Sequence, residues 1–313
     1  MQPFPGLTKG LADSKQLMRA CIYIQQIMSL TDMTILIPFD ESNPLPNIDL
    51  IIKKWSTITA PIYIEKLSPS GRPTGAIALL GSAFCVSRNN NYFLVTAAHV
   101  LKGLPDGLAI TARIGERAVL LNNLPFLLSM EDDLAITMLH ASWTTQFGID
   151  RVRSIDLDDE KKGYTRLGTY ISIGYPGSKN GINQRLNKFA INIHGTSFNE
   201  KLEKHESKPH IKKPVVFKFN KKTALNSNKG RANPPCFSGT SGGPILEIVG
   251  ITKFDDSISM SCRLEGVFLG WHKREKEIIG ASGTALIALI DEVLDKMNES
   301  KTRTTLPSIS THA

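Results

Sequence analysis

The segment Cys236-Phe-Ser-Gly-Thr-Ser241-Gly-Gly-Pro244 is the strongest indication of fold in this chain, because it places a serine between glycines at a sharp turn. Glycine adopts backbone conformations that other residues avoid, and it lets bare backbone N–H groups approach a ligand. Such N–H groups can stabilise an oxyanion, which makes Ser241 a candidate nucleophile. A serine hydroxyl needs a base to take its proton, so the hypothesis requires a histidine and an acidic residue elsewhere.

Two further segments supply these partners. A β-rich apolar run at 93–96 stops at two alanines before His99, so the histidine lies at the edge of a predicted core. The acidic residues Asp132 and Asp133 directly precede an apolar run, where a carboxylate can lie half buried beside a histidine. Asp133 is the preferred acid, and Asp132 stays open as an alternative. Each segment alone also fits a flexible loop or the boundary of an element, so the interpretation depends on all three together.

In the order His99, Asp133, Ser241 the three segments resemble the trypsin-like (chymotrypsin-fold) serine proteases. The resemblance implies an all-β fold of two six-stranded barrels, and we add to it an N-terminal helical extension and a C-terminal helix. We expect a closer likeness to the bacterial HtrA/Deg-like protease domain than to the secreted digestive enzymes. Val100 follows His99, so the disulfide that secreted members often form there is excluded, and Thr240 replaces the aspartate of many activated members.

The resemblance also assigns roles to single residues. Ser241 would attack a peptide carbonyl, His99 would act first as base and then as acid, and Asp133 would fix the histidine tautomer. The oxyanion donors would be the backbone N–H groups of Gly239 and Ser241. The residues implied in substrate binding form two walls, Pro235, Cys236, Phe237 and Ser238 on one side and Leu269, Gly270 and Trp271 on the other. Leu269 stands where the family often has a serine bonded to the acid, which is a departure from its pattern.

Length and periodicity suggest three parts. We expect an extension and linker at 1–58, a protease domain at 59–298 with barrels at about 59–150 and 164–298, and a disordered tail at 299–313. The extension should contain a helix at 14–28 and a linker at 38–46, and a helix over 286–297 should close the domain. The expected strands are 62–67, 76–87, 92–96, 118–128, 134–139, 170–175, 185–193, 215–219, 245–251, 264–271 and 277–281.

Positive charge is concentrated in one segment. Residues 200–231 contain ten Lys or Arg and three Glu, a balance of +7 in a chain whose net charge is +8. Such a segment can bind an anionic partner such as nucleic acid or an acidic protein. A solvated loop is the preferred alternative, because only Phe217 and Phe219 supply aromatic side chains there.

Cysteine usage and hydropathy indicate a compartment. The four cysteines have no zinc-type spacing, so neither a metal nor another cofactor is expected. The N-terminus has no secretory pattern, and no apolar run approaches the roughly 18 residues that cross a bilayer. We therefore predict a cytoplasmic serine endopeptidase with a polypeptide substrate and no integral membrane contact. A catalytically weak or inactive scaffold that binds peptides or acidic and nucleic-acid partners remains the alternative.

Overall fold

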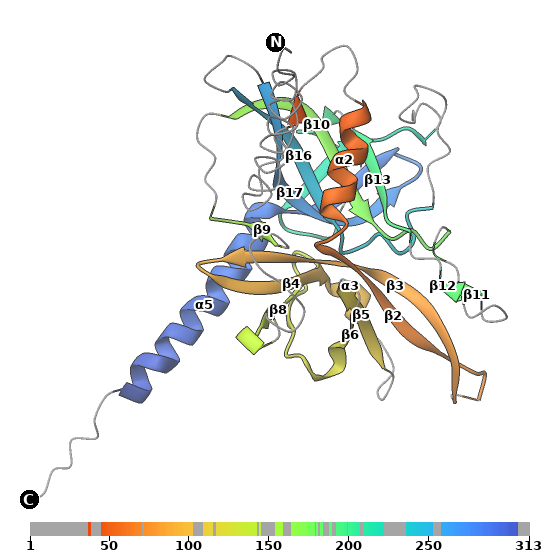
Figure 1. The fold of residues 1–313 in the computed structure, drawn as a ribbon, viewed down its shortest axis with the longest axis vertical. Coiled ribbons are helices and arrows are strands. Elements are labelled where there is room, and N and C mark those ends of the chain that lie inside the picture. Colours follow the sequence, from red (N-terminus) through yellow and green to blue (C-terminus); the bar gives the residue numbers. More distant parts are fainter. Residues whose placement is uncertain are drawn as a thin grey trace, which may run out of the picture.

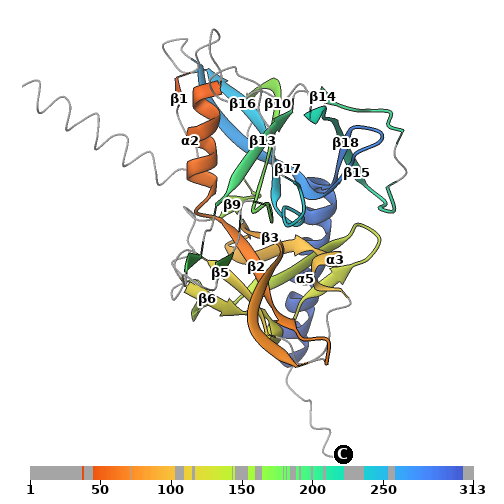
Figure 2. The same cartoon turned by 90° about the vertical axis from the view of Figure 1, so that its right-hand side faces the viewer.

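The chain folds into two antiparallel sheets that lie side by side, each with six main strands and two short ones (Figures 1 and 2). This architecture comes from a computed structural model. It describes residues 37–38, 45–70, 72–102, 109–114, 117–142, 144, 154–158, 164–178, 180, 182–183, 188–189, 192–198, 200–206, 209–221, 236–252 and 258–305. The predicted all-β double barrel with a C-terminal helix is confirmed.

The first sheet has the strand order β6-β5-β2-β3-β4-β8-β7, with β9 paired to β3. Between β3 and β4, Asn89 and Asn90 have φ values of 48° and 59°, the positive values at both central residues that a type I′ hairpin turn requires. The predicted strand 118–128 is wrong, because a 3-10 helix (Leu121–Asn123) divides it and Asn122 Oδ1 accepts the Ile110 N–H at 2.7 Å. The bounds are β2 (Thr59–Leu67), β3 (Pro73–Arg88), β4 (Asn91–Ala97), β5 (Ile110–Ile114), β6 (Arg117–Leu120), β7 (Leu127–Ser129), β8 (Leu134–Leu139) and β9 (Ile155–Asp156).

The second sheet has the order β13-β10-β16-β17-β18-β15-β14, with β1 paired to β17. Most of the predicted strand 185–193 lies outside the described residues, while β13 was not predicted. The bounds are β1 (Ile37–Pro38), β10 (Tyr164–Gly174), β13 (His194–Phe198), β14 (Glu200–Lys201), β15 (Pro214–Lys218), β16 (Pro244–Thr252), β17 (Ile258–His272) and β18 (Glu277–Ser282). A separate pair of short strands is formed by β11 (Ile182–Asn183) and β12 (Lys188–Phe189).

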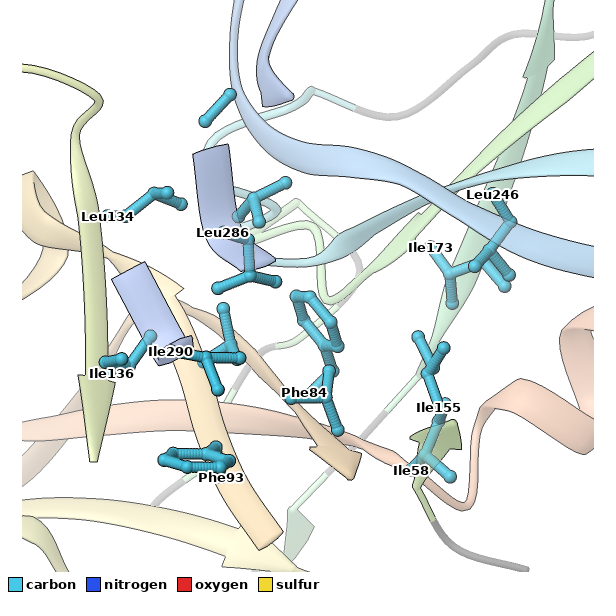
Figure 3. Close-up of a cluster of buried hydrophobic side chains, with 14 of the residues drawn as sticks. Ile58, Phe84, Phe93, Leu134, Ile136, Ile155, Ile173, Leu246, Leu286 and Ile290 are labelled. Carbon is cyan, nitrogen blue, oxygen red and sulfur yellow. The ribbon is translucent and has the colours of Figure 1, made fainter. Parts of the chain in front are cut away.

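A shared hydrophobic core joins the two sheets (Figure 3). Side chains alternate along β3, so Phe84 and Val86 enter this shared core while Ala83 and Cys85 fill the interior of the first barrel. The other contributors labelled in Figure 3 include Leu134 and Ile136 of β8, Ile173 of β10, Leu246 of β16, and Leu286 and Ile290 of α5 (Gly283–Thr305). Burial of each such side chain is worth about 1.5–3 kcal/mol, so the core can hold residues of both barrels in one site.

Helix α2 (Leu45–Trp55) replaces part of the predicted linker. Pro46 lies in its first turn, where the missing N–H costs nothing, so the proline starts the helix instead of breaking it. Ile51 and Trp55 are buried in the shared core, and Ile52 contacts β13 at Gly195. The predicted helix at 14–28 lies outside the described residues.

Helix α5 is longer than the sequence predicted. It continues to Thr305, so residues 299–305, which we assigned to a disordered tail, are helical. The apolar stripe ends near Met297, but a helix needs no apolar stripe to continue for two turns. The sequence between Met297 and Pro307 contains neither glycine nor proline, so no residue in it favours an end of the helix. No helix among the described residues is both long and apolar enough to span a membrane.

The cysteines allow a test of the predicted redox state. Cys85, Cys236 and Cys262 form no disulfide among the described residues, and Cys21 lies outside them. Cys236 is exposed, whereas burial raises the pKa of the Cys85 thiol to about 12. We expect alkylation of the native protein to modify Cys236 long before Cys85, because the thiolate is the reactive form. A thiol count in denaturant should give four, and a count of two or fewer would show that a disulfide is present.

Candidate active site

His99 and Asp133 are in direct contact. His99 lies in the short helix α3 (Ala98–Leu101), which follows β4, and Asp133 ends the tight turn between β7 and β8. The Asp133 Oδ2 atom lies 2.6 Å from His99 Nδ1, and its Oδ1 atom accepts the His99 backbone N–H at 2.8 Å. The Asp133 carbonyl also accepts the Ala98 N–H at 3.0 Å. One aspartate thus fixes both the ring and the backbone of the histidine.

The backbone of Asp133 explains why this aspartate, and not its neighbour, reaches the histidine. Asp133 has φ of +52°, a left-handed conformation that aspartate tolerates better than most residues. Asp132 points elsewhere, since its Oδ1 accepts the backbone N–H of Lys213 at 3.1 Å. The structure therefore brings His99 together with Asp133 and ties Asp132 to the residue before β15.

The turn that carries Ser241 leaves two backbone donors unused. Among residues 239–243, the N–H groups of Thr240, Gly242 and Gly243 donate to Phe237, Phe268 and Thr240 at 3.0, 2.7 and 3.0 Å. The N–H groups of Gly239 and Ser241 donate to no group in the described part of the chain. Gly239 and Gly242 have φ of +89° and +88°, which only glycine adopts readily. The turn therefore presents the two N–H groups that the oxyanion role requires.

Close packing places this turn beside His99. A Cβ atom on Gly242 would lie closer than 3.0 Å to Ser82 O, Thr96 Oγ1 and Ala97 N, the last two belonging to the end of β4. A Cβ atom on Gly81 would meet both the Val100 side chain and the Ser241 carbonyl within 3.0 Å. The Ser241 turn thus lies against Thr96 and Ala97, just before His99, and Gly81 lies between Val100 and the Ser241 carbonyl. Alanine would fit at neither glycine without a shift of the backbone.

Ser82 joins the two barrels at the site, and sequence reasoning missed it. Its Oγ donates to Gly239 O at 2.8 Å and accepts the Tyr175 N–H at 3.0 Å, while its N–H donates to Ser241 O at 2.7 Å. Ser82 is fully buried in β3, and its carbonyl accepts Thr96 Oγ1 at 2.8 Å. A serine between Gly81 and Ala83 in a strand has no local signal of this role, because all its cross-barrel partners lie more than 90 residues away.

The hydroxyl of Ser241 donates to the Leu269 carbonyl at 2.9 Å, not to His99. Leu269 is the extra residue of a β-bulge in β17, between Phe268 and Gly270. Pairing of β17 with β16 ends at Val267, and Phe268 bonds to Gly242 and Gly243, so from Leu269 onward one edge of the strand has no strand partner among the described residues. This free edge begins at Ser241, where the sequence predicted that a substrate strand would pair.

The two predicted substrate walls differ in how open they are. Pro235 lies outside the described residues, Cys236 and Ser238 are exposed, and Leu269 and Gly270 are half-buried. Phe237 is buried, and its ring lies 5.5 Å from the ring of Trp271, which also contacts Phe219. Phe268 stacks on Phe237 and belongs to the same buried aromatic cluster. The Phe237 side chain therefore belongs to the interior of the second barrel and not to an open wall.

Several charged residues near the second barrel already have partners. Lys201 pairs with Glu265, which also contacts Arg263, and Lys212 pairs with Glu131 at 3.2 Å. Glu265 is therefore not a free acidic group. In the described part of the chain, no three His, Cys, Asp or Glu side chains come together as metal ligands would.

Comparison with known proteins gives a limited result. No family model matches the sequence, and no curated protein matches it. Among solved structures, the chain is similar to the serine endoprotease from Yersinia pestis at 14% identity and a TM-score of 0.42, over 83% of this chain and 67% of that one. It is also similar to a structure from work on the intrinsically disordered Sesbania mosaic virus VPg protein, at 13% identity and a TM-score of 0.36, over 72% and 91%. Both TM-scores are below 0.5, so the fold assignment depends on the sheets themselves.

Proposed function

We propose that this protein is a serine endopeptidase that cleaves peptide bonds through an acyl-enzyme. The observation that carries the proposal is the convergence of two arrangements at one place. Asp133 holds both the ring and the backbone of His99, and the adjacent Ser241 turn presents the free N–H groups of Gly239 and Ser241. An oriented imidazole, a hydroxyl and two unpaired donors are the parts that acyl transfer needs.

The chemistry would begin with a rotation of the Ser241 side chain from the Leu269 carbonyl toward His99 Nε2. Oγ would then bond to the substrate carbonyl carbon while Nε2 takes the hydroxyl proton, and Asp133 would stabilise the imidazolium. The negative oxygen would receive the N–H groups of Gly239 and Ser241. Collapse of the intermediate would break the C–N bond, with the proton passing from Nε2 to the leaving amine. A water molecule would repeat these steps to release the acid.

The test is covalent labelling of the intact protein with a fluorophosphonate, together with hydrolysis of an unstructured peptide. We expect the label at Ser241 and cleavage that the same reagent abolishes. Absence of both, in a protein whose circular dichroism shows a folded β structure, would reject the proposal.

A protease-fold scaffold that binds peptides without cutting them is the second candidate. The observation that favours it is the Ser241 hydrogen bond to Leu269, which leaves His99 Nε2 without a partner in the described residues. The same labelling separates the two candidates, because a scaffold would bind a peptide beside Ser241 and leave the fluorophosphonate unreacted.

The substrate walls lead to a prediction about the residue before the cut. The described wall residues carry no carboxylate, and Glu265 is already paired with Lys201. An Arg or Lys side chain entering there would be an unpaired buried cation, which costs several kcal/mol. We expect a preference for small or medium apolar residues in a positional peptide library. Strong selection of Arg or Lys would contradict this and would indicate an acidic wall at Asp255 or Asp256, which lie outside the described residues.

Two finer points belong to the same proposal. We place the enzyme nearer the HtrA/Deg-like domain than the secreted digestive enzymes, because Thr240 takes the position of the activation aspartate and its hydroxyl bonds to Phe237 O at 2.5 Å. We also place it in the cytoplasm, and a thiol count of four is the result that this location predicts.

A further inference from the structure

The turn that follows the free edge of β17 is strongly basic. His272 pairs with Glu277 across the β17–β18 hairpin, and the four residues between them are Lys273, Arg274, Glu275 and Lys276. The three cationic side chains are on exposed residues, and in the described part of the chain none of them has an ion-pair partner.

Strand β15 brings more positive charge to the same place. Lys218 is the register partner of Glu277, and the Phe219 N–H donates to the Lys276 carbonyl at 2.8 Å, so the end of β15 lies beside the turn (Figure 2). We name the resulting group the basic hairpin surface, which consists of Lys218, Lys221, Lys273, Arg274 and Lys276.

Few carboxylates oppose this surface. Glu275 lies in the turn itself, and Glu200 is the register partner of Lys218. Glu277 is buried, and its Oε1 accepts the Glu206 N–H at 3.0 Å. Five cations therefore face three exposed or half-exposed carboxylates close by, Glu200, Glu206 and Glu275, which leaves an excess of positive charge. Lys201 and Lys212 differ from these five, because each already has a carboxylate partner.

The direction of β17 relates this surface to the candidate active site. The strand leaves Ser241 at Leu269 and reaches Lys273 four residues later, about 13 Å away at the usual rise of a strand. Every pairing in the second sheet is antiparallel, so a substrate strand added at the free edge would run the opposite way. Its residues on the N-terminal side of the cut would then approach the turn, beginning at about the fourth residue before the scissile bond.

We propose that the basic hairpin surface selects peptides with Asp or Glu at about the fourth to the sixth residue before the cut. This inference rests on the proposed function for the position of the scissile bond. Lys273 and Arg274 make the largest contribution, because they continue directly from the strand edge that pairs with the substrate. The contacts form at an exposed surface, so each is weak and salt screens it.

The experiment uses peptides that differ only at those three positions, which carry Glu, Gln or Lys. Binding to the Ser241→Ala variant is measured by fluorescence anisotropy, and hydrolysis by wild-type enzyme is measured in parallel. We expect the Glu peptide to bind about tenfold more tightly than the Gln peptide at 50 mM salt, and the difference to fall below about threefold at 500 mM. The double variant Lys273→Gln/Arg274→Gln should lose the difference and hydrolyse the Gln peptide at the wild-type rate.

A matched control removes a lysine and an arginine from the β2–β3 hairpin of the first barrel, as Lys66→Gln/Arg72→Gln. It should keep the preference for Glu. Equal binding of Glu and Gln peptides, with normal hydrolysis of both, would overturn the inference and leave the proposed function intact. Tighter binding of Glu peptides without any hydrolysis would reject the proposed function, and with it the placement of the acidic residues relative to a cut, and would leave only the charge preference of the surface. If a single-stranded oligonucleotide bound through Lys273 and Arg274 while the peptides showed no charge preference, the surface would be a nucleic-acid site and the inference would be wrong.

Discussion

Ser241→Ala should abolish fluorophosphonate labelling and lower kcat by about 10⁶-fold, the loss seen when a serine protease loses its nucleophile. Only the Oγ atom and its 2.9 Å bond to the Leu269 carbonyl are removed. The N–H groups of Gly239 and Ser241 remain, and so do the bonds that the Ser241 carbonyl accepts from Ser82 and that Gly242 donates to Phe268. The melting temperature should therefore stay close to that of the wild type.

His99→Ala should give a similar loss of turnover, and adding the two substitutions together should cost little more than either alone, because the residues act as a unit. Residual cleavage near the wild-type rate in either single variant would show that the hydrolysis comes from another group or from a contaminant. An inactive variant with a collapsed melting temperature would be uninformative, so the labelling comparison is made only on variants that melt like the wild type. Thr240→Ser, which keeps a hydroxyl for the Phe237 carbonyl, is the control that should keep activity.

Asp133→Asn should lower kcat by about 10⁴-fold while the fold is kept. The asparagine oxygen can still accept the His99 N–H that Oδ1 accepts now. Its amide nitrogen would face His99 Nδ1 as a donor, which forces the imidazole proton onto Nε2 and leaves no base for Ser241. The measurement is kcat for a neutral peptide across the pH range in which both proteins are folded.

Asp132→Asn is the matched control for this prediction. Its Oδ1 accepts the Lys213 N–H at 3.1 Å, and an asparagine oxygen can accept the same bond. We expect turnover within about threefold of wild type, since the lost charge touches no proposed catalytic group. A large loss in Asp132→Asn together with normal activity in Asp133→Asn would reverse the assignment of the acid.

Local patterns were enough to predict most strands and the three polar segments of the candidate site. The apolar run at 134–139 predicted β8 with its correct bounds, and the glycines around Ser241 predicted a turn whose positive φ values other residues rarely adopt. Helix α2 was missed because its Pro46 was read as a linker signal, and the end of α5 was missed because its last two turns lack an apolar stripe. Both errors arise because a local pattern has a different meaning at the end of a helix than in its middle. A proline is compatible with the first turn, and the last turns need no apolar stripe.

The sequence alone was sufficient for the all-β class, because strand and turn patterns are properties of neighbouring residues, and the resemblance to trypsin-like proteases gave the double barrel and the candidate order His99, Asp133, Ser241. Tertiary structure decided which aspartate reaches the histidine, since Asp132 is held by Lys213, a residue 81 positions away. It also determined that Ser82 supports the Ser241 turn and that the end of β15 at Lys218 lies beside Lys276. These facts depend on pairings between distant strands, which bring together groups that no local spacing relates.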